Sequence, residues 1–121
     1  MPSAAQTYKN VARQTSNPRE LEASLLLQAA ARLQSVHDAW DRNRSQLDDA
    51  LRYNRKLWSV FLSEMTDAAH PMPKVLRENV ANIGLFVMNH TVKVMSDPHP
   101  QLLGSLININ REIAAGLLGR A

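Results

Sequence analysis

Two pairs of closely spaced prolines divide the sequence more firmly than any other feature. Pro71 and Pro73 form the first pair, and Pro98 and Pro100 form the second. Proline lacks a backbone N–H and its ring clashes with the preceding turn, so no regular helix runs through either pair. The segments between these breaks must therefore fold as separate elements.

The segment before the first pair starts with a strong helix signal at Asn17 and Pro18. The residue before a proline is pushed out of the α region, which suits an N-cap that has a side-chain acceptor. Proline then stands at the first helical position, where its missing N–H costs nothing. Apolar residues follow at spacings of three and four, which predicts an amphipathic helix. They are Leu26, Ala29, Leu33, Val36 and Trp40.

The same apolar register continues far beyond this helix, and residues 19–69 contain neither proline nor glycine. One helix of that length would measure roughly 75 Å at 1.5 Å per residue, which is too long for a compact chain of this size. We therefore predict a break within residues 41–45, with Ser45 and Asp48 as a capping box for the next helix. Without the break, the chain would form a long protruding hairpin. The register continues at Leu47, Leu51, Trp58, Phe61 and Met65.

A third helix is predicted between the two proline pairs, and it has two apolar stripes. A helix that is apolar on two sides either lies at the centre of a bundle or presents one side to a partner. A fourth helix follows the second pair, with Gly119 as its C-terminal stop and Gly116 as a place for close helix contact. The first stripe is Leu76, Val80, Ile83, Val87 and Val94, and the second is Leu85, Met88, Val92 and Met95.

These elements predict an all-α fold, a small bundle of about four helices with a flexible N-terminal arm. The arm is residues 1–16, which are polar and aperiodic, and residues 17–121 form a single helical-bundle domain. The sequence offers no competing strand pattern, because it has no alternating β-branched run and no hairpin dipeptide.

Composition narrows the classes of function that such a bundle can have. The sequence has no cysteine, so disulfides and thiolate metal sites are excluded and a cytoplasmic protein is the default expectation. No apolar run reaches the roughly 20 residues that span a bilayer, so we expect no membrane insertion. The net charge of +3 is spread along the chain, and the densest basic stretch, residues 42–56, is interleaved with acidic residues.

The residues that usually carry catalysis or bind metals occur only in unsuitable arrangements. None of the four histidines lies at helical i, i+4 spacing from another histidine, and we expect His90 to be a partly buried, hydrogen-bonded residue. The adjacent Asp48 and Asp49 point about 100° apart on a helix, so they cannot work as an acid/base pair. We therefore expect a binding protein rather than an enzyme, with no catalytic residues, cofactor or metal.

Two asparagines, Asn54 and Asn110, interrupt the apolar stripes of the second and fourth helices, and Arg55 and Arg111 follow them. A buried amide must find hydrogen-bond partners, or it costs on the order of 1–3 kcal/mol. Either the asparagines fix helix register in the core while the arginines reach solvent, or these residues line a groove and bond a partner's backbone. Trp58 has the same two interpretations, as a core residue or as an interface anchor.

Four short motifs occur along the chain in a defined order. Residues 16–22 read Ser-Asn-Pro-Arg-Glu-Leu-Glu, and residues 54–59 read Asn-Arg-Lys-Leu-Trp-Ser. Residues 72–77 read Met-Pro-Lys-Val-Leu-Arg, and residues 106–117 read Leu-Ile-Asn-Ile-Asn-Arg-Glu-Ile-Ala-Ala-Gly-Leu. Each motif alone is a weak signal, whereas the four together are a specific one.

These motifs resemble those of the flagellar biosynthesis regulator FlaF family, which has Ser-Pro-Arg-Glu, Asn-Arg-Arg-Leu-Trp, Leu-Pro-x-x-Leu-Arg and Leu-Ile-Asp-Ile-Asn-Arg-x-Ile-x-x-Gly-Leu in that order. The resemblance covers roughly residues 8–119. This sequence departs from the family pattern at Asn17, Lys56, Met72 and Asn108. The resemblance implies a protein that binds flagellin in the cytoplasm as a secretion chaperone and affects flagellin synthesis together with a second regulator, FlbT.

The second stripe of the third helix, together with the first helix, is our predicted groove for a flagellin segment. Its residues are Leu85, Met88, Val92 and Met95, and methionines suit a surface that can repack around a partner. The alternative is that this stripe is part of the bundle core.

Two other functions stay open on the sequence alone. The protein could be an RNA-binding regulator of flagellin expression that uses Arg42, Arg44, Arg52, Arg55 and Lys56. The helices offer no platform of aromatic side chains for stacking bases, so nucleic acid is the less expected partner. The protein could also be a scaffold that binds FlbT.

Overall fold

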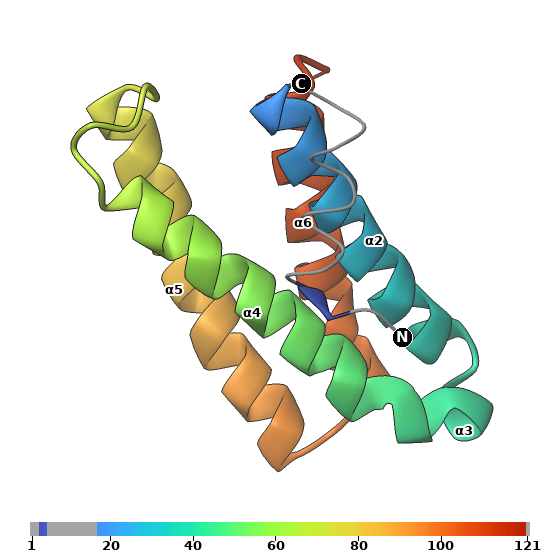
Figure 1. Ribbon diagram of the computed structural model, residues 1–121. Coiled ribbons are helices and arrows are strands. Elements are labelled where there is room, and N and C mark those ends of the chain that lie inside the picture. The colour runs from blue at the N-terminus through green and yellow to red at the C-terminus, as the bar shows by residue number, and fades with distance from the viewer. Residues whose placement is uncertain (1–2, 5–16, 121) are drawn as a thin grey trace.

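The computed structural model describes residues 3–4 and 17–120, and Figure 1 shows the arrangement of their helices. Four long helices and no strand make up this part of the chain, which confirms the predicted all-α bundle. The predicted arm, residues 1–16, lies outside the described residues apart from Ser3 and Ala4. The long helices are α2 (Pro18–Asp38), α4 (Leu47–Met65), α5 (Lys74–Ser96) and α6 (Leu103–Leu117).

The start of α2 confirms the cap that the sequence predicts. The side chain of Asn17 accepts hydrogen bonds from the backbone N–H groups of Arg19 at 3.0 Å and Glu20 at 3.4 Å. Pro18 occupies the first helical position. Two of the N–H groups that a helix start leaves unsatisfied therefore have an acceptor.

The long helical register is broken, as predicted, but the break starts earlier than residues 41–45. Ala39 leaves the helical conformation, with φ −132° and ψ 54°. The predicted capping box is wrong, because α4 has no side-chain cap and its N-cap residue is Gln46. The corner is instead held by Asn43, whose Nδ2 donates to the backbone oxygen of Ser35 at 3.1 Å. Two short elements fill the corner, α3 (Trp40–Asn43) and η1 (Arg44–Gln46).

The helix α4 ends at Met65, several residues before the first proline pair. Backbone oxygens at and after the end of α4 have no helical partner, and Arg77, near the start of α5, supplies donors for three of them. Its guanidinium donates to the backbone oxygens of Met65 at 3.2 Å, Asp67 at 3.1 Å and Met72 at 3.1 Å. One charged side chain therefore binds three backbone oxygens of the connection between α4 and α5.

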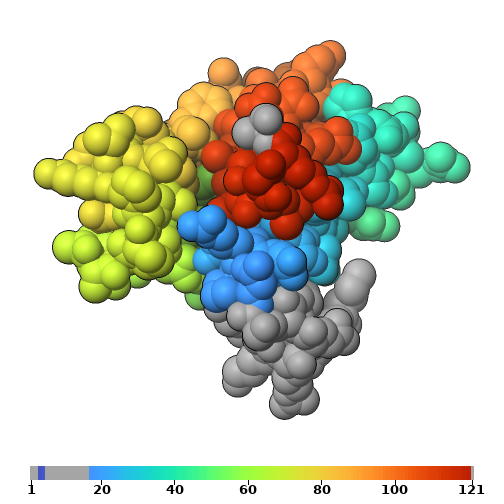
Figure 2. Space-filling view, turned by 90° about the horizontal axis from the view of Figure 1, so that it is seen from above, coloured from blue at the N-terminus to red at the C-terminus, as the bar shows by residue number. Residues whose placement is uncertain are grey.

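The four long helices pack as two pairs, α2 with α6 and α4 with α5, and the contact between α2 and α4 joins the pairs. α2 packs along α6 and also contacts α4, whereas α4 packs along α5. Figure 2 shows the first turns of α2 beside the last turns of α6, with the connection between α4 and α5 at the edge of the molecule. No helix within residues 17–120 has the combined length and apolarity that a membrane crossing requires.

The core lies where these two pairs meet, and it is mainly aliphatic. The predicted positions Leu26, Ala29, Leu33 and Val36 on α2 are buried, while Trp40 is only partly buried. The α4 register is also confirmed, because all five of its predicted core positions are buried. These are Leu47, Leu51, Trp58, Phe61 and Met65.

The close helix contact that the sequence suggested for Gly116 occurs at Gly84 instead. A Cβ atom added to Gly84 would lie 2.7 Å from Cδ2 of Leu62 and 3.2 Å from Cε3 of Trp58, so α5 approaches α4 as only glycine allows. A Cβ at Gly116 would meet nothing within 4 Å. Gly119 has φ +72°, which confirms it as the residue that ends α6.

Candidate functional site

The helix α5 buries one face and leaves many of its other apolar side chains in solvent. Its buried residues recur at spacings of three and four from Val80 to Val94, and they pack toward α4. Of the seven large hydrophobic side chains exposed in the described residues, five belong to α5. Exposed apolar side chains indicate a binding surface where they share one side of a helix, as Leu85 and Val92 do at a spacing of seven. The five are Val75, Leu76, Leu85, Phe86 and Val92.

The second apolar stripe of α5 lies largely on this exposed side. Leu85 and Val92 are each 56% exposed, whereas Met88 and Met95 are partly buried. The core interpretation is therefore wrong for Leu85 and Val92. The predicted groove between this stripe and the first helix is wrong as well, because the main neighbour of α5 is α4, while α2 packs on α6 and α4.

Arg55 borders this stripe on the α4 side. Its Nη1 donates to the sulfur of Met95 at 4.0 Å, so the guanidinium lies where α4 meets the end of α5. Arg55 is partly buried, which places its charge beside an apolar surface rather than in open solvent. We call the set of Leu85, Met88, Val92, Met95 and Arg55 the α4–α5 face.

Three other candidate residues form a hydrogen-bond network inside the protein. Nε1 of Trp58 donates to Oδ1 of Asn110 at 2.9 Å, and Nδ2 of Asn110 donates to Oδ1 of Asn54 at 2.6 Å. Nδ2 of Asn110 also lies 3.4 Å from the backbone oxygen of Leu26, so the network joins α2, α4 and α6. All three side chains are fully buried. This geometry favours the interpretation that the asparagines fix helix register in the core.

Arg111 lies apart from both the network and the α4–α5 face. It is exposed on α6, and its Nη2 donates to Oε1 of Gln34 on α2 at 3.2 Å. Arg55 and Arg111, each next to an asparagine in the sequence, therefore point to different surfaces. Arg111 reaches solvent, as the register interpretation expects, whereas Arg55 stays partly buried against Met95.

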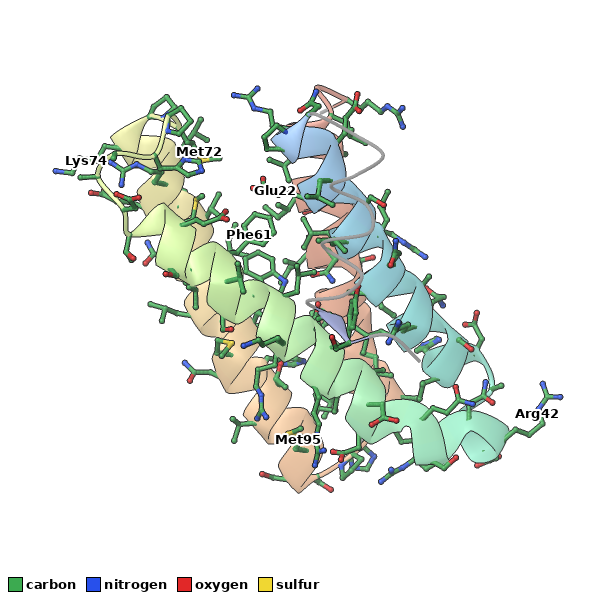
Figure 3. All side chains as sticks on the ribbon, viewed as in Figure 1. Glu22, Arg42, Phe61, Met72, Lys74 and Met95 are labelled. Atoms are coloured by element: carbon green, nitrogen blue, oxygen red, sulfur yellow. The ribbon has the colours of Figure 1, made fainter. Side chains whose placement is uncertain are left out.

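The cations of the RNA alternative lie in three places, which are the α3 corner, the hollow between α2 and α4 that Arg52 and Lys56 line, and the α4–α5 face with Arg55. Arg44 lies over the ring of Trp40 at 5.2 Å, near exposed Arg42 in the α3 corner. Arg52 pairs with Asp48 at 3.0 Å, which partly neutralises it. Figure 3 shows Arg42 at the α3 corner, away from Met95 at the end of α5. No continuous basic stripe of the kind that tracks a phosphate backbone follows from this placement.

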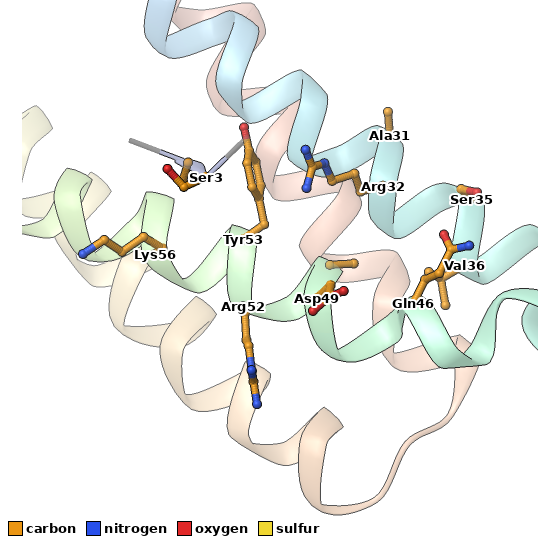
Figure 4. Close-up of a pocket in the computed structure, with 12 residues that line it drawn as sticks. Ser3, Ala31, Arg32, Ser35, Val36, Gln46, Asp49, Arg52, Tyr53 and Lys56 are labelled. Atoms are coloured by element: carbon orange, nitrogen blue, oxygen red, sulfur yellow. The ribbon is translucent and has the colours of Figure 1, made fainter. Parts of the chain in front are cut away.

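A hollow between α2 and α4 is a feature that the sequence analysis missed. It has a volume of about 770 Å³, and Ser3 and Ala4 lie at its edge. Figure 4 shows Arg32 of α2 beside Tyr53 of α4, and the guanidinium carbon lies 4.1 Å from the ring centre. Burial raises the pKa of the Tyr53 phenol above its usual value. Tyr53 gave no sequence signal, because it lies off the main apolar stripe of its helix.

Glu22 lies in a second, smaller cleft of about 260 Å³, between the start of α2 and the loop after α4. Burial and the nearby carboxylate of Glu64 raise the pKa of Glu22 from 4.5 to about 7. Glu22 is on α2 and Glu64 is on α4, so this carboxyl pair lies across the junction of the two helix pairs. The sequence gave no sign of this contact.

His90 is the hydrogen-bonded residue that the sequence predicts. Its Nε2 donates to the backbone oxygen of Leu102 at 2.7 Å, and its ring stacks on Phe86 at 5.2 Å between centres. His90 thus attaches α5 to the segment that leads into α6. Within residues 3–4 and 17–120, no group of three or more histidine, aspartate or glutamate residues is placed to hold a metal ion.

Comparison with known proteins identifies one family. A family model described as flagellar protein FlaF matches residues 4–117, which is nearly the whole chain. No curated protein and no solved structure matches the sequence.

Proposed function

The chain belongs to the flagellar protein FlaF family, and we propose that it binds flagellin in the cytoplasm as a secretion chaperone that supports flagellin synthesis and export. The observation that carries this proposal is the α4–α5 face, where Leu85 and Val92 are exposed side by side with partly buried methionines. The motif resemblance supplies flagellin as the partner. FlbT is a further partner that the resemblance suggests.

The chemistry of flagellin fits such a face. Its terminal segments are amphipathic and pack as helices in the filament, so in the monomer they expose apolar surface. An apolar helix face can cover one side of such a segment and delay premature polymerisation. Because the segment becomes ordered only when it binds, part of the interaction energy is lost to ordering, which favours release at the export gate.

Calorimetry with the purified protein and monomeric flagellin tests this proposal. We expect saturable binding that survives raised salt and disappears when one terminal segment of flagellin is deleted. Val92→Asp should weaken binding at least about tenfold, because the new carboxylate would lie in the apolar contact. Val75→Asp is the matched control, since Val75 is 70% exposed on the same helix but outside the α4–α5 face.

Absence of binding to any form of flagellin would overturn the proposal. Flagellin messenger and FlbT would then be the next partners to measure. An RNA complex is recognised by affinity that collapses between low and moderate salt, because counterions released from phosphates dominate such binding.

A further inference from the structure

The stripe on α5 continues beyond the α4–α5 face, and its two ends differ in charge. Toward the start of the helix, the spacing of three and four leads from Leu85 through Ala81 to Glu78. Glu78 pairs with Lys74 at 3.9 Å, so this end holds a balanced pair of charges. The other end holds Arg55 against Met95. Among the described residues, no carboxylate forms an ion pair with Arg55.

We infer that the α4–α5 face takes an amphipathic helix of flagellin that places acidic side chains at the Arg55 end, an inference that rests on the proposed function. From Ala81 to Met95 the stripe is about 21 Å long at 1.5 Å per residue, which matches about four turns of a bound helix. The apolar residues provide the contact, and Arg55, the cation of this face, gives the bound helix a direction.

Arg55 is suited to this selection because it is already partly buried. A helix laid over the face removes water from the guanidinium, and a buried cation without an acceptor is costly. A partner carboxylate at that position compensates the charge and forms a charge-assisted hydrogen bond. A helix bound in the reverse direction leaves Arg55 unpaired, so the face discriminates by penalty as well as by attraction.

Charge reversal at Arg55 tests the inference, with monomeric flagellin as the partner. Arg55→Glu should weaken binding at least about tenfold, and raised salt should narrow the difference from the unmodified protein. Arg42→Glu is the matched control, because it makes the same change in net charge at the exposed α3 corner. Arg55→Gln removes the charge without reversing it, so its affinity for flagellin should lie between those of Arg55→Glu and Arg42→Glu. Thermal unfolding of each variant establishes that the bundle is intact.

A complementary change in flagellin makes the test specific. Replacing acidic residues of the recognised segment by lysine should weaken binding to the unmodified protein and restore binding to Arg55→Glu. If Arg55→Glu binds as tightly as Arg42→Glu while the unmodified protein binds flagellin, the inference fails and the proposed function stands. If flagellin does not bind the unmodified protein, both fail.

Discussion

The helices α2 and α5 are similar in length but differ in how the rest of the chain uses them. α2 buries eight of its 21 residues and contacts both α6 and α4. α5 buries five of its 23 residues, although it carries most of the exposed large hydrophobic side chains. Apolar content alone therefore does not distinguish a helix that is held by its own chain from one that keeps a face for a partner.

Polar contacts sharpen this difference. α2 contributes the backbone oxygen of Leu26 to the buried network around Asn110. The buried hydroxyl of Thr91 on α5 donates to the backbone oxygen of Val87 in its own helix at 2.7 Å, so it forms no hydrogen bond to a neighbouring helix. The attachment of α5 depends instead on the close approach at Gly84, on His90, and on the hydrogen bond from Arg77 to the backbone oxygen of Met65.

Asn110→Ala breaks the α2 side of the comparison, and of the truncations to alanine it should have the largest effect. It leaves Nε1 of Trp58 and Oδ1 of Asn54 without partners in the interior and opens a small cavity. We expect a loss of about 3 kcal/mol in the free energy of unfolding, measured with denaturant. Asn108→Ala, at an exposed position of the same helix, should change it by less than about 0.5 kcal/mol.

Gly84→Val tests the α5 side of the comparison, because it disturbs the packing of α5 on α4. A Cβ at Gly84 would lie 2.7 Å from Cδ2 of Leu62, which is closer than real contacts, and 3.2 Å from Cε3 of the buried Trp58, so both side chains must shift at the α4–α5 seam. Overpacking of this kind costs about 2 kcal/mol, and a denaturant melt measures it. Gly116→Val is the control, because its Cβ meets nothing and valine is slightly better than glycine in a helix. Equal losses at the two glycines would contradict the seam.

The pH dependence of stability tests the surroundings of Glu22 at the junction between α2 and α4. Its pKa is raised from 4.5 to about 7 in the folded protein, so the folded state holds a proton that the unfolded state releases. The contribution of Glu22 to stability should be fully present below pH 4.5 and be lost as pH rises through about 7. Glu22→Gln should flatten this slope and stabilise the protein at pH 8 by about 1 kcal/mol, after discounting for solvent screening. A pH profile of Glu22→Gln in thermal melts that equals that of the unmodified protein would show that the pKa of Glu22 is not raised in the folded state.

The smallest effect on stability is expected from Val92→Asp on the exposed side of α5. Because Val92 is already in solvent, the free energy of unfolding should change by less than about 0.5 kcal/mol. Val94→Asp, two residues further along, is the opposite case, because Val94 is fully buried and the carboxylate should prevent folding. Circular dichroism melts of the two variants distinguish them. If Val92→Asp also unfolds the protein, the α4–α5 face is part of the core.

Local signals in the sequence predicted local structure well. The cap at Asn17, the stop at Gly119 and the four long helices are confirmed, because each depends on residues within one or two turns. The corner after α2 was placed a few residues late, and its capping box is wrong. A polar stretch indicates a break, but the hydrogen bond from Asn43 to Ser35 that sets its position depends on how the chain turns back.

The sequence could not say which stripe of α5 is buried or which glycine is crowded. Both depend on the neighbour of α5, and that neighbour is α4 rather than the predicted first helix. The same limit applies to the candidate site. Arg55 and Met95 are 40 residues apart and meet only because α4 and α5 run side by side, so helical spacing within one element cannot join them.

The pairing of α2 with α6 also sets the order in which the chain can become stable. These are the first and last long helices, and Asn110 of α6 provides the hydrogen bonds that join α2 to α4. On the ribosome, α2, α4 and α5 are made before α6 exists. Contacts between distant segments form slowly, since the intervening chain must first be closed into a loop. The nascent protein therefore exposes the apolar side of α2 that packs on α6 until α6 has been made.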